Sequence, residues 1–317
     1  DRVEELRFSP DGQILASVDW TGRLIFWNTQ DWTIRYQIDG NFNSFMSFAP
    51  DGRFAIGDHA GATLVLDPAT GQELLRIPGG ARPVWSTDGG RIAAFGRVGP
   101  PDILDPATGA LLQRFTGFDT TSAAFALSAD FSRLVVIQSG EASVIDPITR
   151  DVFATLRAPQ DGGMPEDIVF SSQGDVLAVI WSDQSASLHD SQTGQARHVL
   201  PGNVASVQFS PDSKQILVAT TDDQTSLINV ETGQAVAQAL GNLYSLQAFL
   251  PDGQTFATAV GPYRGLLFFA RDTAEIRGNL VNHATAFVRI ASSPDGAWIV
   301  TSTGDGQLRL WATEQVI

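Results

Sequence analysis

The sequence contains no cysteine and a single lysine, Lys214, among its 317 residues. The absence of cysteine excludes disulfides, thiolate metal sites and cysteine nucleophiles. A single lysine leaves no second one for a phosphate cradle or a Schiff base. With 35 acidic and 20 basic residues, the net charge of −15 argues against the positive field that binding to nucleic acid or to anionic lipid requires. We therefore expect neither a nucleic-acid partner nor a membrane partner.

Long hydrophobic runs are also missing from the sequence. The longest, such as Gly265–Ala270, have the length of a strand and fall far short of the roughly 20 residues of a membrane-spanning helix. The first residues show no basic segment followed by an apolar one, and the chain starts with Asp1, so we expect a processed chain or an excised piece. We expect a cytoplasmic location, or a periplasmic or extracellular one if a signal peptide was removed.

The usual catalytic signatures are absent as well. The sequence has no G-x-S-x-G elbow, no H-E-x-x-H motif and no phosphate-binding loop ending in Lys-Ser or Lys-Thr. Gly304-Asp-Gly306 lacks the third glycine of a dinucleotide-binding loop. We expect structural or solvated roles for the four histidines, His59, His189, His198 and His283. The sequence thus predicts no catalytic residue, no metal site and no cofactor.

What the sequence does contain is a repeat. A turn motif of the form Phe8-Ser-Pro-Asp-Gly12 occurs eight times, at a spacing of about 40 residues that fills the chain. Proline presets φ, aspartate bonds the backbone two residues on, and glycine accepts a positive φ, so the motif predicts a tight turn. Its fourth positions are Asp11, Asp51, Asp88, Asp130, Gln173, Asp212, Asp252 and Asp295.

Each repeat contains four short apolar runs separated by turns, as in Val204–Phe209, Arg23–Trp27 and Glu73–Ile77. A second recurring turn, of the form Asp67-Pro-Ala-Thr-Gly71, separates the third run from the fourth. No segment shows a sustained helical period. The fold class predicted is all-β: an eight-bladed β-propeller of four-stranded antiparallel blades, with seven blades plus an irregular unit as the alternative. The expected blades are 1–40, 41–79, 80–117, 118–159, 160–201, 202–241, 242–282 and 283–317.

The repeats resemble the WD-repeat β-propeller family in a degenerate, bacterial form. The first unit, Phe8–Trp27, and the last, Ser293–Trp311, are the most similar. The Trp-Asp pair of that family is altered in most units, for example to Trp27-Asn28. The resemblance therefore implies that the family's His–Asp–Ser–Trp hydrogen-bond network is absent or partial in most blades.

The resemblance also implies a function. It points to a non-catalytic recognition or scaffold propeller, acting as the sensor or regulatory domain of a larger bacterial signalling protein such as a STAND-type ATPase, a kinase or a caspase-like protease fused in cis. Two alternatives remain open. The Asp-x-x-Thr-Gly turns are similar to those of quinone-dependent propeller enzymes, which keeps a quinone-dependent or hydrolytic enzyme possible, and some envelope assembly factors are also eight-bladed.

The last unit runs out soon after its third apolar run, and Glu314–Ile317 makes a poor fourth strand. An unpaired strand edge is unfavourable. We therefore expect that the eighth outer strand comes from sequence outside this segment, or that Gln315–Ile317 forms a stub of it. Either outcome describes residues 1–317 as a single propeller domain of a longer chain.

Binding residues are expected on one face of the propeller, where the links between blades and the turns between second and third strands gather. Aromatic and arginine side chains in such loops are typical of protein-binding hot spots, although large apolar side chains also tuck between blades. We expect a protein or peptide partner on this loop rim or at the channel mouth. The candidates are Trp20, Phe42, Arg82, Arg97, Phe118, Trp181, Tyr244, Tyr263 and Arg264.

Overall fold

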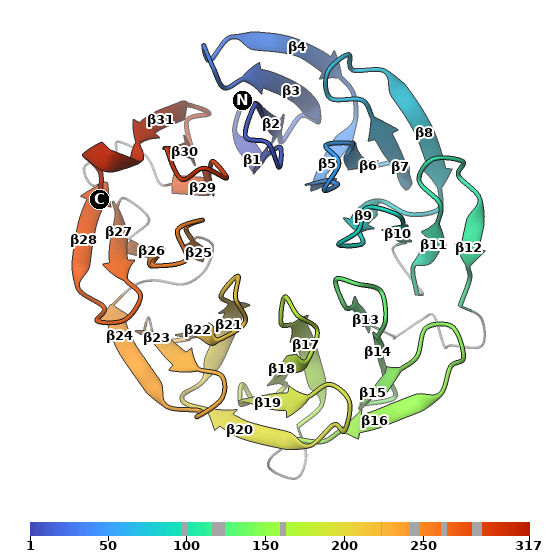
Figure 1. Cartoon of the computed structure of the whole chain (residues 1–317), viewed down its shortest axis with the longest axis vertical. Helices are drawn as coiled ribbons and strands as arrows, with labels where there is room; N and C mark the ends of the chain where they lie inside the picture. Colours follow the sequence, from blue (N-terminus) through green and yellow to red (C-terminus); the bar gives the residue numbers. More distant parts are fainter. Residues whose placement is uncertain are drawn as a thin grey trace. The chain divides into compact units, whose positions relative to one another are not determined.

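The computed structural model describes residues 1–96, 100–115, 124–158, 163–222, 224–240, 247–260, 265–280 and 287–317. These residues form eight antiparallel sheets, each a meander of strands consecutive in the chain (Figure 1). The single helix among them is a three-residue 3-10 turn, η1 (Thr313–Gln315). The predicted all-β fold, an eight-bladed β-propeller, is confirmed. No helix in the described part of the chain is long and apolar enough to cross a membrane.

The chain divides into two compact units. The first comprises Asp1–Thr121 with Phe287–Gln315, and the second comprises Ser122–Ala286 with Val316–Ile317. The first unit therefore holds blades 1, 2, 3 and 8, and the second holds blades 4 to 7.

The strands of the first unit belong to four sheets. Blade 1 contains β1 (Val3–Phe8), β2 (Ile14–Asp19), β3 (Arg23–Asn28) and β4 (Ile34–Asp39). Blade 2 contains β5 (Phe42–Phe48), β6 (Phe54–Asp58), β7 (Ala62–Leu66) and β8 (Glu73–Pro78). Blade 3 contains β9 (Arg82–Trp85), β10 (Ile92–Phe95), β11 (Asp102–Leu104) and β12 (Leu111–Gln113). Blade 8 contains β29 (Phe287–Ser292), β30 (Trp298–Thr303) and β31 (Leu308–Ala312).

The second unit contains four four-stranded sheets. Blade 4 contains β13 (Ala124–Leu127), β14 (Leu134–Gln138), β15 (Glu141–Ile145) and β16 (Val152–Leu156). Blade 5 contains β17 (Pro165–Phe170), β18 (Val176–Trp181), β19 (Ala186–Asp190) and β20 (Ala196–Leu200). Blade 6 contains β21 (Val204–Phe209), β22 (Gln215–Thr220), β23 (Gln224–Asn229) and β24 (Ala235–Leu240). Blade 7 contains β25 (Gln247–Phe249), β26 (Thr255–Val260), β27 (Gly265–Ala270) and β28 (Ile276–Leu280).

Burial along the strands explains why the apolar runs differ within a blade. The second strands, such as β2 and β18, are buried at nearly every position because both of their faces pack against side chains. The fourth strands, such as β8 and β20, are mostly exposed and bury an aliphatic residue near their ends. The core therefore lies between adjacent sheets, where burying one large aliphatic side chain contributes about 1.5–3 kcal/mol.

The turn between the first and second strands is held by a serine as well as by the aspartate. Ser9 Oγ donates to Asp11 Oδ1 at 2.6 Å and accepts from the N–H of Ile14 at 2.9 Å. The hydrogen bond from Ser9 is the main reason that the pKa of the Asp11 carboxyl lies below its usual value. The same serine–aspartate bond joins Ser86 to Asp88, Ser128 to Asp130, Ser210 to Asp212 and Ser293 to Asp295. The repeated motif therefore encodes a hydrogen-bonded turn.

The structure describes three strands in blade 8 and four strands in each of the other seven blades. Thr313–Gln315 form η1 directly after β31, and Val316 and Ile317 are not in a strand. The expected stub at Gln315–Ile317 is therefore wrong, because none of these residues is part of a strand.

The partial hydrogen-bond network expected from the resemblance is present. Trp27 Nε1 donates to Ser17 Oγ at 2.9 Å in blade 1, and Trp311 Nε1 donates to Thr301 Oγ1 at 3.0 Å in blade 8. In blade 5, Ser187 Oγ lies 2.8 Å from Nε2 of the buried His189. Burial lowers the pKa of His189 from its ordinary value, as expected for a structural imidazole.

Candidate functional site

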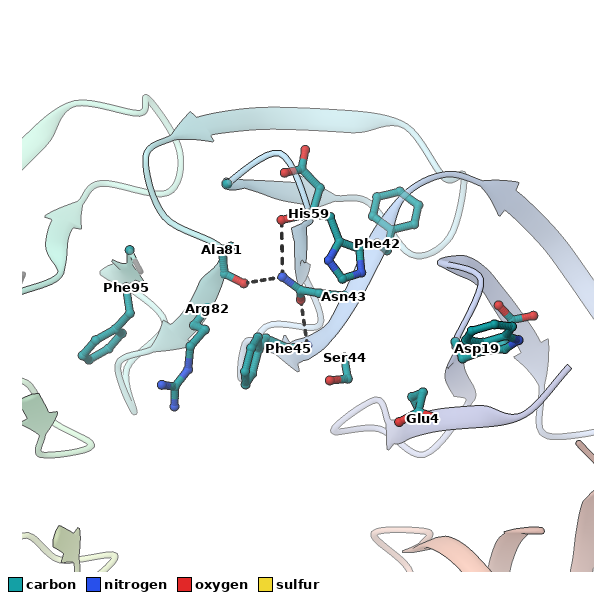
Figure 2. A pocket seen from close by; sticks show the side chains of 14 residues that line it. Glu4, Asp19, Phe42, Asn43, Ser44, Phe45, His59, Ala81, Arg82 and Phe95 are labelled. Atoms are coloured by element: carbon teal, nitrogen blue, oxygen red, sulfur yellow. Dashed lines mark hydrogen bonds between the residues drawn. The ribbon is translucent and has the colours of Figure 1, made fainter. Parts of the chain in front are cut away.

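A cavity of about 450 Å3 lies at the loop ends of blades 1, 2 and 3, all within the first unit (Figure 2). Three of the predicted binding residues, Trp20, Phe42 and Arg82, line it. They come from the β2–β3 turn, the start of β5 and the start of β9. The structure therefore brings these three together, as the placement of loops on one face predicted.

The β2–β3 turn presents an indole on a fixed backbone. Asp19 Oδ1 accepts hydrogen bonds from the N–H groups of Thr21 and Arg23 at 3.0 and 3.1 Å. The N–H of Trp20 donates to the carbonyl of Arg2 at 2.9 Å. The turn is therefore held from both sides, yet the Trp20 side chain remains 68% exposed. An exposed indole on a fixed backbone loses little conformational freedom when a partner covers it.

A bulge in β5 shapes the middle of the cavity. Phe42 pairs with Asp58 and Met46 pairs with Ile56, so two extra residues lie on the β5 side of the ladder. Asn43 holds the bulge, because its Oδ1 accepts from the N–H of Phe45 at 2.9 Å and its Nδ2 donates to the carbonyl of Ala81 at 3.0 Å (Figure 2). As a result Phe45 points into the cavity and is 45% exposed.

Close backbone contact between blades 2 and 3 depends on Gly57 in β6. A Cβ atom at this position would lie 1.7 Å from the carbonyl oxygen of Ala81, much closer than any real contact. Glycine is therefore required for β6 to approach the residues before β9. This approach also brings the Ala81 carbonyl within reach of Asn43.

The charges around the cavity are predominantly negative. Of the described residues, Glu4, Asp19 and Asp58 line it, and Arg82 is the one lysine or arginine among them. The Arg82 guanidinium carbon lies 4.7 Å from the centre of the Phe45 ring, in a cation–π contact (Figure 2). His59 also lies in the wall. In the described part of the chain, no three His, Asp or Glu side chains are grouped closely enough to hold a metal ion.

The other predicted site residues have different positions. Phe42 is 6% exposed and belongs to the core between blades 1 and 2, so it forms the base of the cavity. Trp181 is a correction: it ends β18, is 1% exposed and donates to Ser187 Oγ at 2.9 Å, so it belongs to the core and has no exposed ring. Arg97, Phe118, Tyr244, Tyr263 and Arg264 lie outside the described residues.

Asn43, Phe45 and the two carboxylates Glu4 and Asp19 were not predicted as site residues. A signal for the bulge is present in Phe42–Phe48, where apolar residues at positions 42, 45, 46 and 48 break the alternation of a regular strand. In the sequence, Asp19 is explained by its role in forming a turn, so its position at the cavity could not be predicted. Glu4 occupies an ordinary strand position with no distinguishing pattern.

Comparison with known proteins identifies the repeats. The family model "WD domain, G-beta repeat" matches residues 1–28, 194–228 and 275–312. The chain is a β-propeller that carries WD repeats in these segments. A search of curated proteins returns no match.

Two solved structures resemble this WD-repeat propeller over nearly its whole length. The crystal structure of the C-terminal WD40 domain of Sif2 has a TM-score of 0.77 at 14% identity, covering 98% of this chain and 96% of that one. The computationally designed Ika8 protein has a TM-score of 0.76 at 18% identity, with the same coverage of both chains. At these identities the likeness shows the fold alone. WD40 propellers generally are non-catalytic domains that bind proteins or peptides, and the fold of this chain is consistent with an interaction scaffold.

Proposed function

We propose that this propeller is a non-catalytic recognition domain that binds a cationic segment of a partner protein in the cavity of blades 1 to 3. The observation that carries the proposal is the cavity itself, which combines the exposed rings of Trp20 and Phe45 with an excess of carboxylates. Aromatic rings provide large contact area, and their faces attract arginine and lysine side chains.

The charge at the cavity favours a cationic partner over an acidic one. Among the described lining residues, three carboxylates accompany the Arg82 guanidinium, and the whole chain carries −15. Glu4 pairs with Arg2 at 3.2 Å and Asp58 with Arg76 at 3.5 Å, so Asp19 is the carboxylate of the three for which no ion pair is found within the described chain. Complementary charge steers association and discriminates between partners, and it makes the association rate sensitive to salt. The Arg82 guanidinium is already stacked on Phe45, so a second cation would face the open ring of Trp20 and the carboxylates of Glu4 and Asp19.

Selection from a library of random 12-residue peptides, with the 317-residue chain as bait, tests this proposal. We expect the selected peptides to be enriched in arginine and lysine, and to bind at least tenfold more weakly to Trp20→Ala and Phe45→Ala variants. Ile148→Ala is the matched control, because Ile148 is 70% exposed and lies in the β15–β16 turn of blade 4. Enrichment in acidic peptides, or equal binding to all three variants, would contradict the proposal.

We also propose that the domain acts as the sensor or regulatory part of a larger bacterial signalling protein in the cytoplasm, with a STAND-type ATPase, kinase or caspase-like protease domain in the same chain. The support is the resemblance to propellers of that kind. The test is the coding sequence that flanks this segment, followed by the activity of the encoded catalytic domain with and without the propeller. A regulatory role requires that activity to change when residues 1–317 are removed.

A further inference from the structure

The cavity of blades 1 to 3 has two ends of opposite charge. Figure 2 shows Arg82 at one end and Asp19 at the other, with Ser44 between them. Trp20 follows Asp19 in the β2–β3 turn, and Phe45 adjoins Arg82. Each end therefore combines one charged group with one exposed aromatic ring. A single segment that fills the cavity must meet both charges.

Arg82 is held in place by aromatic rings rather than by a carboxylate. It lies opposite Phe95 in the β9–β10 ladder, and its guanidinium carbon is 4.7 Å from the centre of the Phe45 ring. No Asp or Glu in the described part of the chain forms an ion pair with it. Stacking engages the flat face of a guanidinium and leaves the N–H groups at its edge able to donate. Because Arg82 is exposed, these donors are accessible to a partner.

Other arginines of the first unit show the usual alternative, an ion pair within the protein. Those that pair with Asp or Glu are Arg2, Arg7, Arg23, Arg53, Arg76, Arg114 and Arg289. Arg53 also stacks on Trp85 at 5.0 Å, yet it pairs with Asp51 at 2.7 Å. Stacking alone therefore does not prevent an ion pair. At Arg82 the described chain lacks the carboxylate that Arg53 has, so that carboxylate is left for a partner to supply.

The carboxylate at the other end of the cavity is also available to a partner. Asp19 Oδ1 accepts hydrogen bonds from groups of its own turn, whereas Oδ2 accepts none from the residues that the structure describes. The other two carboxylates of the wall, Glu4 and Asp58, are already ion-paired within the chain. A partner cation therefore meets Asp19 beside the exposed indole of Trp20, whose face also attracts cations.

We propose that the partner segment is dipolar, with a cationic side chain at Asp19 and Trp20 and a carboxylate that accepts hydrogen bonds from Arg82. This inference rests on the function proposed above, and it adds the second charge and the direction of the segment in the cavity. A planar guanidinium matches a carboxylate with two parallel N–H···O bonds, and stacking on Phe45 already fixes its orientation. A singly charged anion suits the site better than a phosphate, because the carboxylates in the wall repel added negative charge.

Peptides of designed charge test this inference. In dye-labelled peptides capped at both ends, arginine and glutamate are separated by zero to four glycines, and a matched series has glutamine in place of glutamate. At the spacing that fits the cavity, we expect the glutamate peptide to bind about tenfold more tightly by fluorescence anisotropy, the size expected for a charge-assisted hydrogen-bonded pair. A third series replaces glutamate by a free terminal carboxylate. It separates a chain terminus from a side chain as the source of the carboxylate, and a preference for either source supports the proposal.

Variants of the chain assign the carboxylate to Arg82. Arg82→Gln should bind the glutamate and glutamine peptides equally, and Arg82→Glu should prefer a peptide with a second arginine in place of glutamate. Arg133→Gln is the matched control and should keep the preference for glutamate, because Arg133 also stacks on a phenylalanine, Phe153, at 5.0 Å, but in blade 4. Asp19→Asn should weaken binding of both series and leave the preference between them unchanged. Circular dichroism establishes that each variant is folded.

The outcomes separate this inference from the function on which it rests. Equal affinity of glutamate, glutamine and free-carboxylate peptides at every spacing would overturn the dipolar partner, while weaker binding of all of them to Trp20→Ala would still support a cationic one. A preference for glutamate that persists in Arg82→Gln would overturn the role of Arg82. Absence of saturable binding by all three series would also overturn the dipolar partner. The proposed function would fall only if the peptides selected from the random library lacked enrichment in arginine and lysine, or bound the Trp20→Ala and Phe45→Ala variants unchanged.

Discussion

Aspartate fixes the backbone in two regions, the turns between first and second strands and the loops around the cavity. The two regions differ in which side chains they leave exposed to solvent. In the turn at Ser9, serine and aspartate bond to each other and to the backbone, and the serine is buried. In the β2–β3 turn, Asp19 performs the same backbone role while Trp20 beside it stays exposed. One end of the blades is therefore specified by the requirements of the fold. The other end carries side chains that the fold does not require.

The largest loss of stability should come from disrupting the close backbone contact that shapes the cavity. Gly57→Ala places a methyl group 1.7 Å from the Ala81 carbonyl oxygen, so blade 2 must shift. We expect a loss of about 3 kcal/mol in the free energy of unfolding, measured by denaturant titration. Gly90→Ala is the control, because the nearest atom to its added Cβ is 3.4 Å away. Equal losses in the two variants would show that the approach at Ala81 is not a constraint.

A smaller loss should follow from removing one serine of the repeated turn. Ser9→Ala leaves the N–H of Ile14 without its acceptor and removes a donor to Asp11, at a buried position. We expect a loss of about 1–3 kcal/mol by the same measurement. Ser185→Ala tests the opposite end of a blade, where an exposed hydroxyl donates to Asp183 Oδ1 at 2.6 Å. That variant should lose only a few tenths of a kcal/mol, as expected for an exposed group. A loss as large as that of Ser9→Ala would remove the distinction between the two ends.

The pH dependence of stability should show a contribution from the β19–β20 turn of blade 5. A hydrogen bond from the Arg197 guanidinium lowers the pKa of Asp190 to about 2. Because the folded pKa is depressed, the stabilisation is present above the unfolded value of about 3.9 and is lost as the pH falls through about 2. Asp190→Asn should therefore flatten the fall in unfolding free energy between about pH 4 and pH 2. The flattening should amount to about 1 kcal/mol, since the pair is partly exposed.

Arg197→Gln removes the cause of that pKa shift while keeping the carboxyl. It should flatten the acid limb nearly as much as Asp190→Asn does, when unfolding is followed at a series of pH values. A full acid limb in Arg197→Gln would assign the low pKa to the backbone N–H groups of Gln192 and Thr193, which also donate to Asp190.

These contrasts match what could and could not be predicted from sequence. Turn residues and strand periods act locally, so the repeat at Ser9–Gly12 predicted the blades and their order. The cavity depends on contacts distant in sequence, such as Gly57 with Ala81 and Asn43 with Ala81, and no local pattern announces them. Trp181 was misjudged because it was placed in a loop. The apolar run Val176–Ile180 before it indicates a buried strand, and Trp181 is the last residue of that strand.

Trp20→Ala should have the smallest effect on stability, although Trp20 is the residue proposed to matter most for binding. Trp20 is 68% exposed, and its turn is held by Asp19 and by main-chain hydrogen bonds rather than by the indole. Trp20→Ala should therefore change the free energy of unfolding by less than about 0.5 kcal/mol. The same variant should weaken binding of the selected cationic peptides at least tenfold, because an exposed indole in a recognition cavity acts mainly through its partner. A large loss of stability with unchanged peptide affinity would make Trp20 a structural residue and reverse the comparison between the two ends of the blades.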